Sequence, residues 1–404
     1  MKKIFPVLVV LFLASCGKFP MPTQVGDGSL SEVYENTQTG QKIEVVKSHK
    51  AKRPRKDGEA RIAFLIPLSG DKQSIGINML DATQMAMHDL KAEHINLVPI
   101  DTAYGVASVK TRLEEEDFDL VIGPLYSQDA KDLYPLVQSK GLCMITFSND
   151  NELRNRDCLF MLGVMPEESV KRVLTYAREK LPADIYAVLP RNKYGEVIES
   201  SIAKLNRRLE APVTVIGRYN QESTAADMQQ VAVNIKFHSS PNSALLVPEG
   251  TSSLAGFINE LRSKGGAGRY KMLGSGLWDD ERLYKIPELN GAWFANIPHS
   301  KRDKFEKRFM AHFDYKPSRL SSLAYDSIAL VAALSKKSSN RNAFDKVAIT
   351  NQAGFKGITG LFRFLPDGSN QRTMAVYEIR SDGLIQIDPA PATFQGMFRD
   401  LIAG

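Results

Sequence analysis

The chain has 404 residues, of which 43% are hydrophobic, and this length is enough for two lobes with sizeable cores. Its net charge is +6, but residues 1–60 hold 10 Lys and Arg against 6 Asp and Glu, so the remainder carries only +2. A nearly neutral body lacks the basic face that attracts nucleic-acid phosphates, and this argues against a nucleic-acid partner.

The N-terminus has the pattern of a secretion signal, because residues 1–15 carry two lysines and then an apolar stretch too short to span a bilayer. The sequence Leu13-Ala14-Ser15-Cys16 resembles the lipobox of bacterial lipoproteins, in which the cysteine is lipidated as the signal is cut. We therefore expect a signal peptide at 1–15 and a membrane anchor on Cys16. Gly17 stands where inner-membrane lipoproteins of enteric bacteria carry Asp, which favours the outer membrane, facing the periplasm.

Residues 16–60 are predicted to be a flexible tether, because they are rich in Pro, Gly, Ser, Thr, Lys and Gln. We expect at most one short strand in it, around 43–46. Fully extended, the tether would reach about 150 Å. Its basic run at 47–56 could contact anionic lipid or a partner, although a solvated linker is the simpler interpretation. No later apolar run approaches the ~18 residues of a transmembrane helix.

From Arg61 onward, short apolar strands alternate with amphipathic helices. The first series predicts strands at 61–66, 95–101, 119–123, 142–147 and 159–164, with a helix ending near Ala92 and others at about 105–116 and 128–139. The second series predicts strands at 185–190, 213–219, 244–248, 270–275 and 291–295, with helices that begin at Tyr194, Thr224 and Ser252. Two such series imply an α/β fold with two mostly parallel sheets, each flanked by helices.

The C-terminal part follows a different pattern. Helices at about 300–313 and 319–336 precede strands at 360–364, 373–380 and 384–387, and Ser381-Asp382-Gly383 predicts a hairpin between the last two. Strands that follow the second sheet in this way indicate several crossings between two lobes. We assign 61–165 plus 296–354 to lobe one, 166–295 plus 355–386 to lobe two, and 387–404 to a C-terminal helix.

Two cysteines follow Cys16, namely Cys143 and Cys158, and both lie at the edges of predicted strands. A secreted protein meets conditions in which disulfides form. The sequence leaves open a disulfide between them or two small buried thiols.

A ligand cleft between the lobes is predicted from the polar residues at the carboxyl ends of the strands, where helix N-termini present free N–H groups. The candidates are Ser69, Gly70, Ser127, Ser148 and Asn149 from the first lobe and Tyr194, Ser275, Trp278 and Asp279 from the second. Helix capping explains each of them as well as ligand binding does.

Catalytic motifs are missing. The six histidines form no HExxH or other short metal-binding spacing, and there is no GxSxG, no GxxxxGK[ST] and no GxGxxG after the first strand. We therefore predict no catalytic residue, no metal and no cofactor, and a protein that is not an enzyme.

Seven stretches resemble a known family: IPLSG (66–70), LVIGPLYS (120–127), TFSND (146–150), LGSGLWDDERL (273–283), GAWFANIP (291–298), PSRLSSLAYDSIAL (317–330) and GITGLFRFLPDG (357–368). Residues 61–386 resemble the type I periplasmic-binding-protein clamshell, and these stretches resemble its lipoprotein activators of penicillin-binding proteins. The resemblance implies a non-enzymatic lipoprotein that binds and stimulates a class A penicillin-binding protein and so regulates peptidoglycan synthesis. The best-studied activator has an additional N-terminal helical-repeat domain, whereas about 44 residues of tether precede the clamshell in this sequence.

The alternative is a solute receptor for amino acids or related small molecules that feeds an ABC transporter. Ser127 and Ser148 lie where amino-acid receptors of this superfamily bind a ligand carboxylate. Those receptors often carry a Glu beside Gly in the loop where this sequence reads Gly276-Leu277-Trp278. Asp279 and Asp280 could replace it, but such a pair more simply caps a short helix. This departure favours the protein-interaction role.

Three further residues receive structural interpretations. Trp278, in a loop, is predicted to be exposed and to serve as an interface anchor. Trp293, in a strand, is predicted to be core. Tyr325-Asp326 is similar to a recurring motif of the clamshell and is predicted to tie the hinge.

Overall fold

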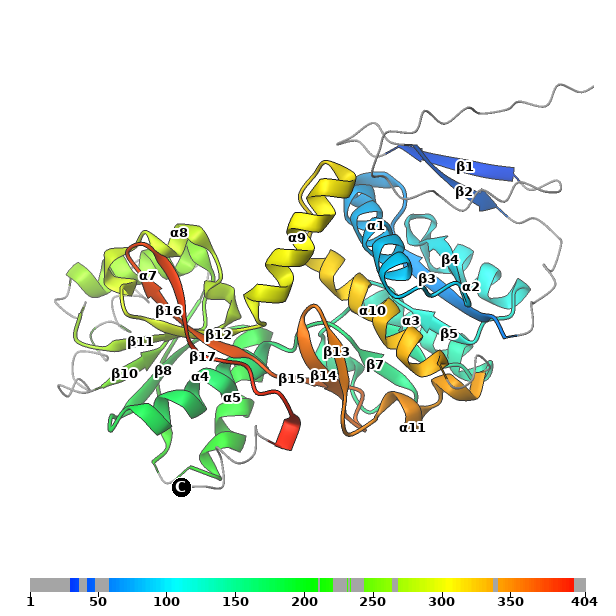
Figure 1. Cartoon of the computed structure of the whole chain (residues 1–404). Helices are drawn as coiled ribbons and strands as arrows, with labels where there is room; N and C mark the ends of the chain where they lie inside the picture. The colour runs from blue at the N-terminus through cyan, green and yellow to red at the C-terminus, as the bar shows by residue number, and fades with distance from the viewer. Residues whose placement is uncertain are drawn as a thin grey trace, which may run out of the picture.

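The computed structural model describes residues 30–35, 42–47, 58–209, 211–220, 231, 233, 243–263, 268–336 and 341–395. Within these residues the chain forms two α/β lobes that lie side by side (Figure 1). The predicted α/β clamshell, with helices flanking each sheet, is confirmed.

Lobe one contains a five-stranded, fully parallel sheet of order β4-β3-β5-β6-β7. Its strands are β3 (Ala60–Ile66), β4 (Ile95–Asp101), β5 (Leu120–Ile122), β6 (Met144–Thr146) and β7 (Leu159–Met161). Alternate side chains of β3 enter two different cores, as expected for a strand covered on both faces. One face is covered by α1 (Gln73–Asp89), α9 (His299–Phe313) and α10 (Arg319–Ser335), and the other by α2 (Gly105–Glu115) and α3 (Ser127–Ser139).

Lobe two contains a seven-stranded mixed sheet of order β17-β16-β12-β11-β10-β8-β9. The parallel strands are β8 (Ile185–Pro190), β9 (Val213–Tyr219), β10 (Ala244–Leu246), β11 (Lys271–Gly274) and β12 (Trp293–Asn296). The antiparallel pair β16 (Ala375–Arg380) and β17 (Gly383–Asp388) forms the predicted hairpin, which is confirmed. Helices α4 (Pro166–Lys180) and α5 (Lys193–Asn206) cover one face, and α7 (Thr251–Ser263) and α8 (Glu281–Tyr284) the other.

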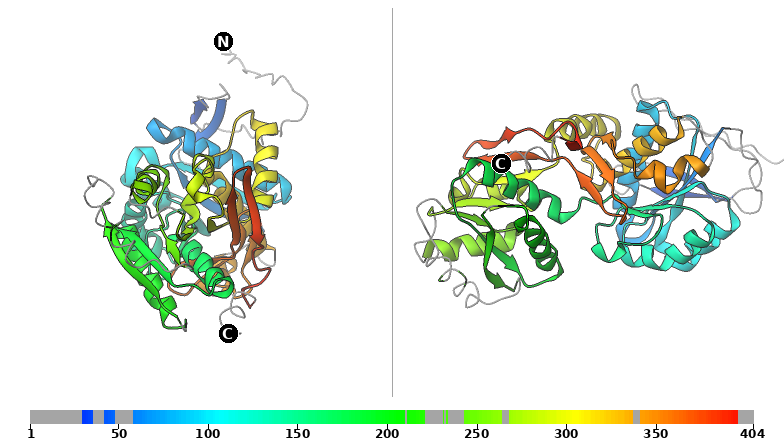
Figure 2. Two further views of the ribbon diagram at one scale, coloured as in Figure 1. Left: turned by 90° about the vertical axis from the view of Figure 1, so that its left-hand side faces the viewer. Right: turned by 90° about the horizontal axis from the view of Figure 1, so that it is seen from below.

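A small antiparallel sheet of β13 (Phe355–Gly357), β14 (Gly360–Phe364) and β15 (Asn370–Arg372) lies beside lobe one (Figure 1). Sequence analysis assigned these strands to lobe two, yet Phe355, Phe362 and Phe364 pack in the lobe-one core. In the part of the chain that the structure describes, the backbone passes between the lobes at 162–165, 297–298 and 373–374. The right-hand view of Figure 2 shows the two lobes and the segments that connect them from below.

The remaining described elements are short. They are α11 (Lys346–Ile349) and the 3-10 helices η1 (Gly70–Lys72), η2 (Thr102–Tyr104), η3 (Asn151–Leu153), η4 (Gly276–Trp278), η5 (Pro287–Leu289) and η6 (Arg341–Phe344). No helix among the described residues combines the length and apolarity that crossing a membrane requires.

The N-terminal segment contains a hairpin of β1 (Leu30–Glu35) and β2 (Lys42–Lys47), in which Leu30 pairs with Lys47. The prediction of at most one short strand was therefore wrong, because β2 finds an antiparallel partner in the LSEVYE stretch. Residues 1–29, including Cys16, and the basic run from 48 lie outside the described residues, as does most of the helix predicted from Thr224.

The predicted C-terminal helix at 387–404 is only partly covered. Ile387 and Asp388 belong to β17, which corrects its beginning, and residues 396–404 lie outside the described part.

A disulfide joins Cys143 and Cys158, whose Cα atoms lie 4.6 Å apart. Each cysteine directly precedes one of two neighbouring parallel strands, since Met144 of β6 pairs with Leu159 of β7. Of the two alternatives that the sequence left open, the structure has the bridge.

Candidate functional site

A cleft of ≈1030 Å³ lies between the lobes and is lined by residues of both lobes and of two crossing segments. Four of the nine candidates line it: Asn149, Tyr194, Ser275 and Asp279. The other five are not part of its lining: Ser69, Gly70, Ser127, Ser148 and Trp278. The carboxyl ends of the parallel strands therefore bring only four of the nine predicted residues to the cleft.

The hydroxyls of lobe one stabilise turns. Ser69 Oγ donates to Asp101 Oδ2 at 2.6 Å, and the other carboxylate oxygen of Asp101 accepts the Leu68 N–H at 2.8 Å. Ser148 Oγ accepts the Asp150 N–H at 3.1 Å. Ser148 thus bonds to the backbone of its own turn, whereas Ser69, although it precedes η1, makes no capping hydrogen bond and bonds to Asp101 instead.

The polar groups of lobe two also bond to one another. Tyr194 Oη donates to Ser275 Oγ at 3.1 Å, and burial raises the pKa of Tyr194 to about 12, so this phenol stays neutral. The Gly276 N–H donates to Ser169 Oγ at 3.0 Å. Ser169 was missed by sequence analysis, because it lies inside α4 and not at a strand end.

Asp279 is the most heavily engaged candidate. Its Oδ1 accepts from Tyr284 Oη at 3.0 Å, and its Oδ2 accepts from Asn296 Nδ2 at 2.8 Å and from Arg302 Nη1 at 2.6 Å. His299 Nε2 lies 3.2 Å from the same Oδ2. Burial opposes ionisation, but the contact with His299 and the hydrogen bond and positive charge of Arg302 outweigh it, so the pKa of the Asp279 carboxyl is well below its usual range.

Asp280 differs from its neighbour. Its Oδ1 accepts the Arg282 N–H at 2.9 Å at the start of α8, and its carboxylate pairs with the Arg282 guanidinium at 2.6 Å. The capping interpretation of the Asp pair holds for Asp280, whereas the side chain of Asp279 bridges to other elements.

Trp278 is fully buried, so the prediction of an exposed interface anchor was wrong. Its ring lies over Gly274, where an added Cβ would be 2.0 Å from Trp278 Cδ2, so this position needs a residue without a side chain. Leu277, which is 43% exposed, lines the cleft instead. Trp293 is buried as predicted, and its Nε1 donates to Glu378 Oε2 at 2.9 Å.

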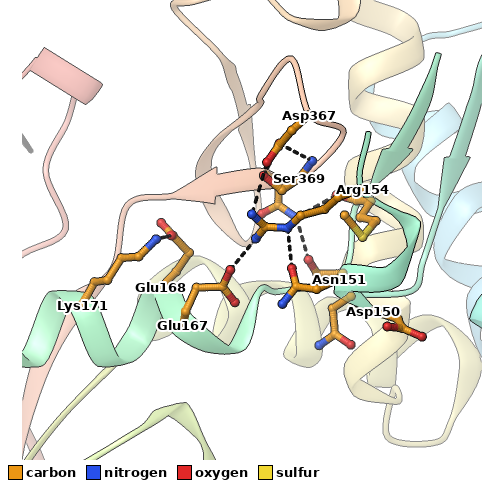
Figure 3. A network of polar contacts seen from close by, with 12 residues as sticks. Asp150, Asn151, Arg154, Glu167, Glu168, Lys171, Asp367 and Ser369 are labelled. Atoms are coloured by element: carbon orange, nitrogen blue, oxygen red, sulfur yellow. Dashed lines mark hydrogen bonds and ion pairs between the residues drawn. The ribbon is translucent and has the colours of Figure 1, made fainter. Parts of the chain in front are cut away.

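The first crossing is fastened by Arg154, which follows η3 in lobe one (Figure 3). Its guanidinium lies 2.6 Å from Glu167 Oε1, at the start of α4 in lobe two, and 3.2 Å from Asp367 Oδ2 in the turn before β15. Ser369 Oγ donates to the other oxygen of Asp367 at 2.6 Å. One cation therefore joins segments on both sides of the crossing.

Asp326 of α10 ties the small sheet to lobe one, a structural role, although these contacts lie within lobe one and not at the hinge that was predicted for Tyr325-Asp326. Its carboxylate accepts the backbone N–H groups of Ile358 at 2.7 Å and Thr359 at 3.1 Å. A Cβ on Gly357 would lie 2.2 Å from Asp326 Oδ1, so the strand approaches this closely because residue 357 is glycine. Arg372, which faces Asp326, donates to Leu162 O in the first crossing at 2.6 Å.

A family model described as periplasmic binding protein matches residues 59–384. No curated protein sequence matches the chain.

Solved structures with the same fold have low sequence identity. A putative branched-chain amino acid ABC transporter from Rhodospirillum rubrum has a TM-score of 0.71 at 14% identity, covering 81% of this chain and 100% of that one. The C-domain of LpoA from Haemophilus influenzae, a regulator of PBP1A, has a TM-score of 0.65 at 17% identity, covering 81% and 100%. LivJ from Streptococcus pneumoniae, in complex with isoleucine, has a TM-score of 0.54 at 20% identity, covering 82% and 100%.

The match to LpoA concerns part of that protein, since this chain spans 59% of the full-length LpoA chain. The family match covers both lobes and all three crossings seen in the described residues. The chain therefore belongs to the periplasmic-binding-protein family, in its type I clamshell form.

Proposed function

We propose that this chain is a non-enzymatic lipoprotein that binds and stimulates a class A penicillin-binding protein and so regulates peptidoglycan synthesis. In this proposal a lipid on Cys16 anchors it to the periplasmic face of the outer membrane. The observation that carries the proposal is the state of the cleft, where the groups that would bind a free amino acid either lie outside the lining or, like Asp279, are engaged by other parts of the protein.

A clamshell that binds a free amino acid must offer hydroxyl or N–H donors to the carboxylate and an anion to the ammonium group. In lobe one, the hydroxyl of Ser69 donates to Asp101, and Ser127 and Ser148, the expected carboxylate-binding serines, are not part of the cleft lining. Asp279 has both oxygens engaged, and an ammonium group would have to displace Arg302. Displacement would leave the Arg302 guanidinium, which is only 21% exposed, without its strongest partner. Separating such a shielded ion pair costs more free energy than separating an exposed one.

Two other observations support a regulator. The fold accommodates such a role, because the LpoA C-domain that shares it is a regulator of PBP1A. The tether also remains long enough to separate the body from a membrane. The β1–β2 hairpin brings residues 30 and 47 side by side and shortens the maximum reach from about 150 Å to about 90 Å.

The direct test is glycan polymerisation by a purified class A penicillin-binding protein on lipid II, with and without the full chain. We expect a faster rate and co-purification of the two proteins. An unchanged rate together with no recovered complex would contradict the proposal.

The anchor is tested separately with Cys16→Ala. We expect this variant to stimulate the synthase in solution but to leave the outer-membrane fraction of cells. A variant that stays in that fraction would disprove lipid anchoring through Cys16, without bearing on the stimulation.

A solute receptor for amino acids or related molecules is the second candidate. The observation in its favour is the cleft of ≈1030 Å³ that both lobes line, in a fold shared with LivJ bound to isoleucine. A thermal-shift screen over amino acids and cell-wall fragments separates the two. A true ligand at 100 times its Kd would add about 2.7 kcal/mol to the free energy of unfolding, saturably.

A further inference from the structure

Asp279 connects the two lobes. It follows η4 in lobe two, and its partners Tyr284 and Asn296 belong to the same lobe. Arg302 and His299 lie in α9, a lobe-one helix whose buried side chains Phe305, Phe309 and Phe313 are part of the lobe-one core. The carboxylate therefore receives hydrogen bonds from its own lobe and a charge-assisted hydrogen bond from Arg302 of the other.

The backbone of Asp279 makes a second contact with lobe one. Arg319, the first residue of α10, donates from Nη2 to the Asp279 carbonyl oxygen at 2.8 Å. Two arginines, 23 and 40 residues further along the chain, thus converge on one residue of lobe two. Contacts to both the side chain and the backbone restrain the orientation of the η4–α8 loop as well as its distance from lobe one.

Burial makes this contact stronger than an exposed ion pair. The side chains of Asp279 and Arg302 are 9% and 21% exposed, and Glu306 Oε1 lies 3.6 Å from Arg302 Nε on the same helix. Among the described residues, two further ion pairs join the lobes. Arg154 with Glu167, at the first crossing, is also largely shielded, with side chains 24% and 6% exposed. Lys193 with Glu152 has side chains that are 83% and 48% exposed. Water and salt screen such an exposed pair, so it contributes little to holding the lobes.

We propose that Asp279 is an interlobe clasp, in which the side chain of Arg302 and the hydrogen bond from Arg319 hold the two lobes at one angle. The crossing at 297–298 lies directly between Asn296 and His299, so the clasp spans the backbone segment about which the lobes would turn. Loss of the clasp widens the range of interlobe angles, while both cores and the Arg154–Glu167 pair at the first crossing stay intact. The inference goes beyond the proposed function and does not depend on which partner or ligand the protein has.

The test measures the distance between the lobes in the full chain by pulsed electron paramagnetic resonance. Ketone-bearing residues replace Glu115 on α2 and Lys204 on α5, two exposed positions in different lobes, and carry oxime-linked spin labels. This chemistry leaves every cysteine untouched. We compare Asp279→Asn with Asp280→Asn, which removes the same charge from the next residue, whose carboxylate pairs with Arg282 of the same lobe.

We expect Asp279→Asn to broaden the distance distribution and displace its maximum, and Asp280→Asn to overlay the wild type. Should Asp279→Asn not fold, Arg319→Gln carries the test, because this exposed side chain contributes only its contact to the Asp279 carbonyl among the bonds found in the described residues. A folded Asp279→Asn or Arg319→Gln protein with the wild-type distribution overturns the proposal, as does an Asp280→Asn protein that changes it equally.

Discussion

Asp81 should make the stability of lobe one depend on pH. It lies on α1, is 2% exposed, and accepts a hydrogen bond from Tyr315. Burial raises the pKa of the Asp81 carboxyl from 3.8 to about 7, even though the bond from Tyr315 works in the opposite direction. The carboxyl group is thus protonated in the folded protein at pH values where it ionises in the unfolded chain.

The sign follows from proton binding. Between pH 3.8 and about 7 the folded state binds more protons at Asp81 than the unfolded state does. The free energy of unfolding therefore falls as the pH rises through this window, and the stability is fully present only below it. A shift of about 3 pKa units corresponds to about 4 kcal/mol.

The perturbation that isolates this effect is Asp81→Asn, which cannot ionise. We expect the difference in free energy of unfolding, variant minus wild type, to rise by up to about 4 kcal/mol between pH 4 and pH 7.5. Urea unfolding at four pH values, followed by circular dichroism, measures it. Asp71→Asn, at an exposed position in η1, is the control and should follow the wild type at every pH. Parallel stability curves for Asp81→Asn and the wild type would refute the reasoning.

Two further predictions concern the packing over Gly274 and the disulfide between Cys143 and Cys158. Gly274→Ala should lower the free energy of unfolding by about 1–3 kcal/mol and shift the tryptophan emission, because its Cβ would overlap the ring of Trp278. Gly256→Ala, within α7 and with open space around it, should be neutral or stabilising by up to about 1 kcal/mol, and equal losses in both variants would contradict the packing argument. Cys143→Ser should lower the free energy of unfolding by about 3 kcal/mol, because the disulfide to Cys158 closes a loop between cysteines 15 residues apart. The bridge itself is checked by the mass of the unreduced protein, which should be lower by two hydrogens than after reduction.

Much of the architecture could be predicted because buried parallel strands read as short apolar runs bounded by turn residues. The same pattern does not indicate in which lobe's core a strand packs. Phe355, Phe362 and Phe364 form an ordinary apolar strand pattern, and nothing local shows that they pack in lobe one and not in the lobe that precedes them along the chain. That information lies in contacts between residues far apart in sequence, such as those of Asp326 with the backbone after Gly357.

The candidate site was predicted less well because binding and capping use the same residue types. Asp279 and Asp280 are chemically identical neighbours, yet Asp280 bonds within its own helix start while Asp279 reaches across to α9. The difference is made by Arg302, which sequence analysis had no reason to connect with this loop. Trp278 shows the same limit, since its burial depends on the bare backbone of Gly274 beneath its ring.

The contacts of Asp279 bear on both proposals at once. The guanidinium of Arg302 satisfies the carboxylate that an amino-acid ligand would need, and it belongs to the other lobe. In a receptor, the clasp would thus have to open before the ammonium group of an amino-acid ligand could bind. Opening it breaks a charge-assisted hydrogen bond that is largely shielded from water. A regulator gains from the same bond, because two lobes held at one angle present a surface that a partner protein can bind without first ordering it. If Asp279→Asn releases the lobes and also weakens stimulation of the synthase, a fixed angle is part of the activity. If stimulation survives with the lobes free, the partner binds within a single lobe.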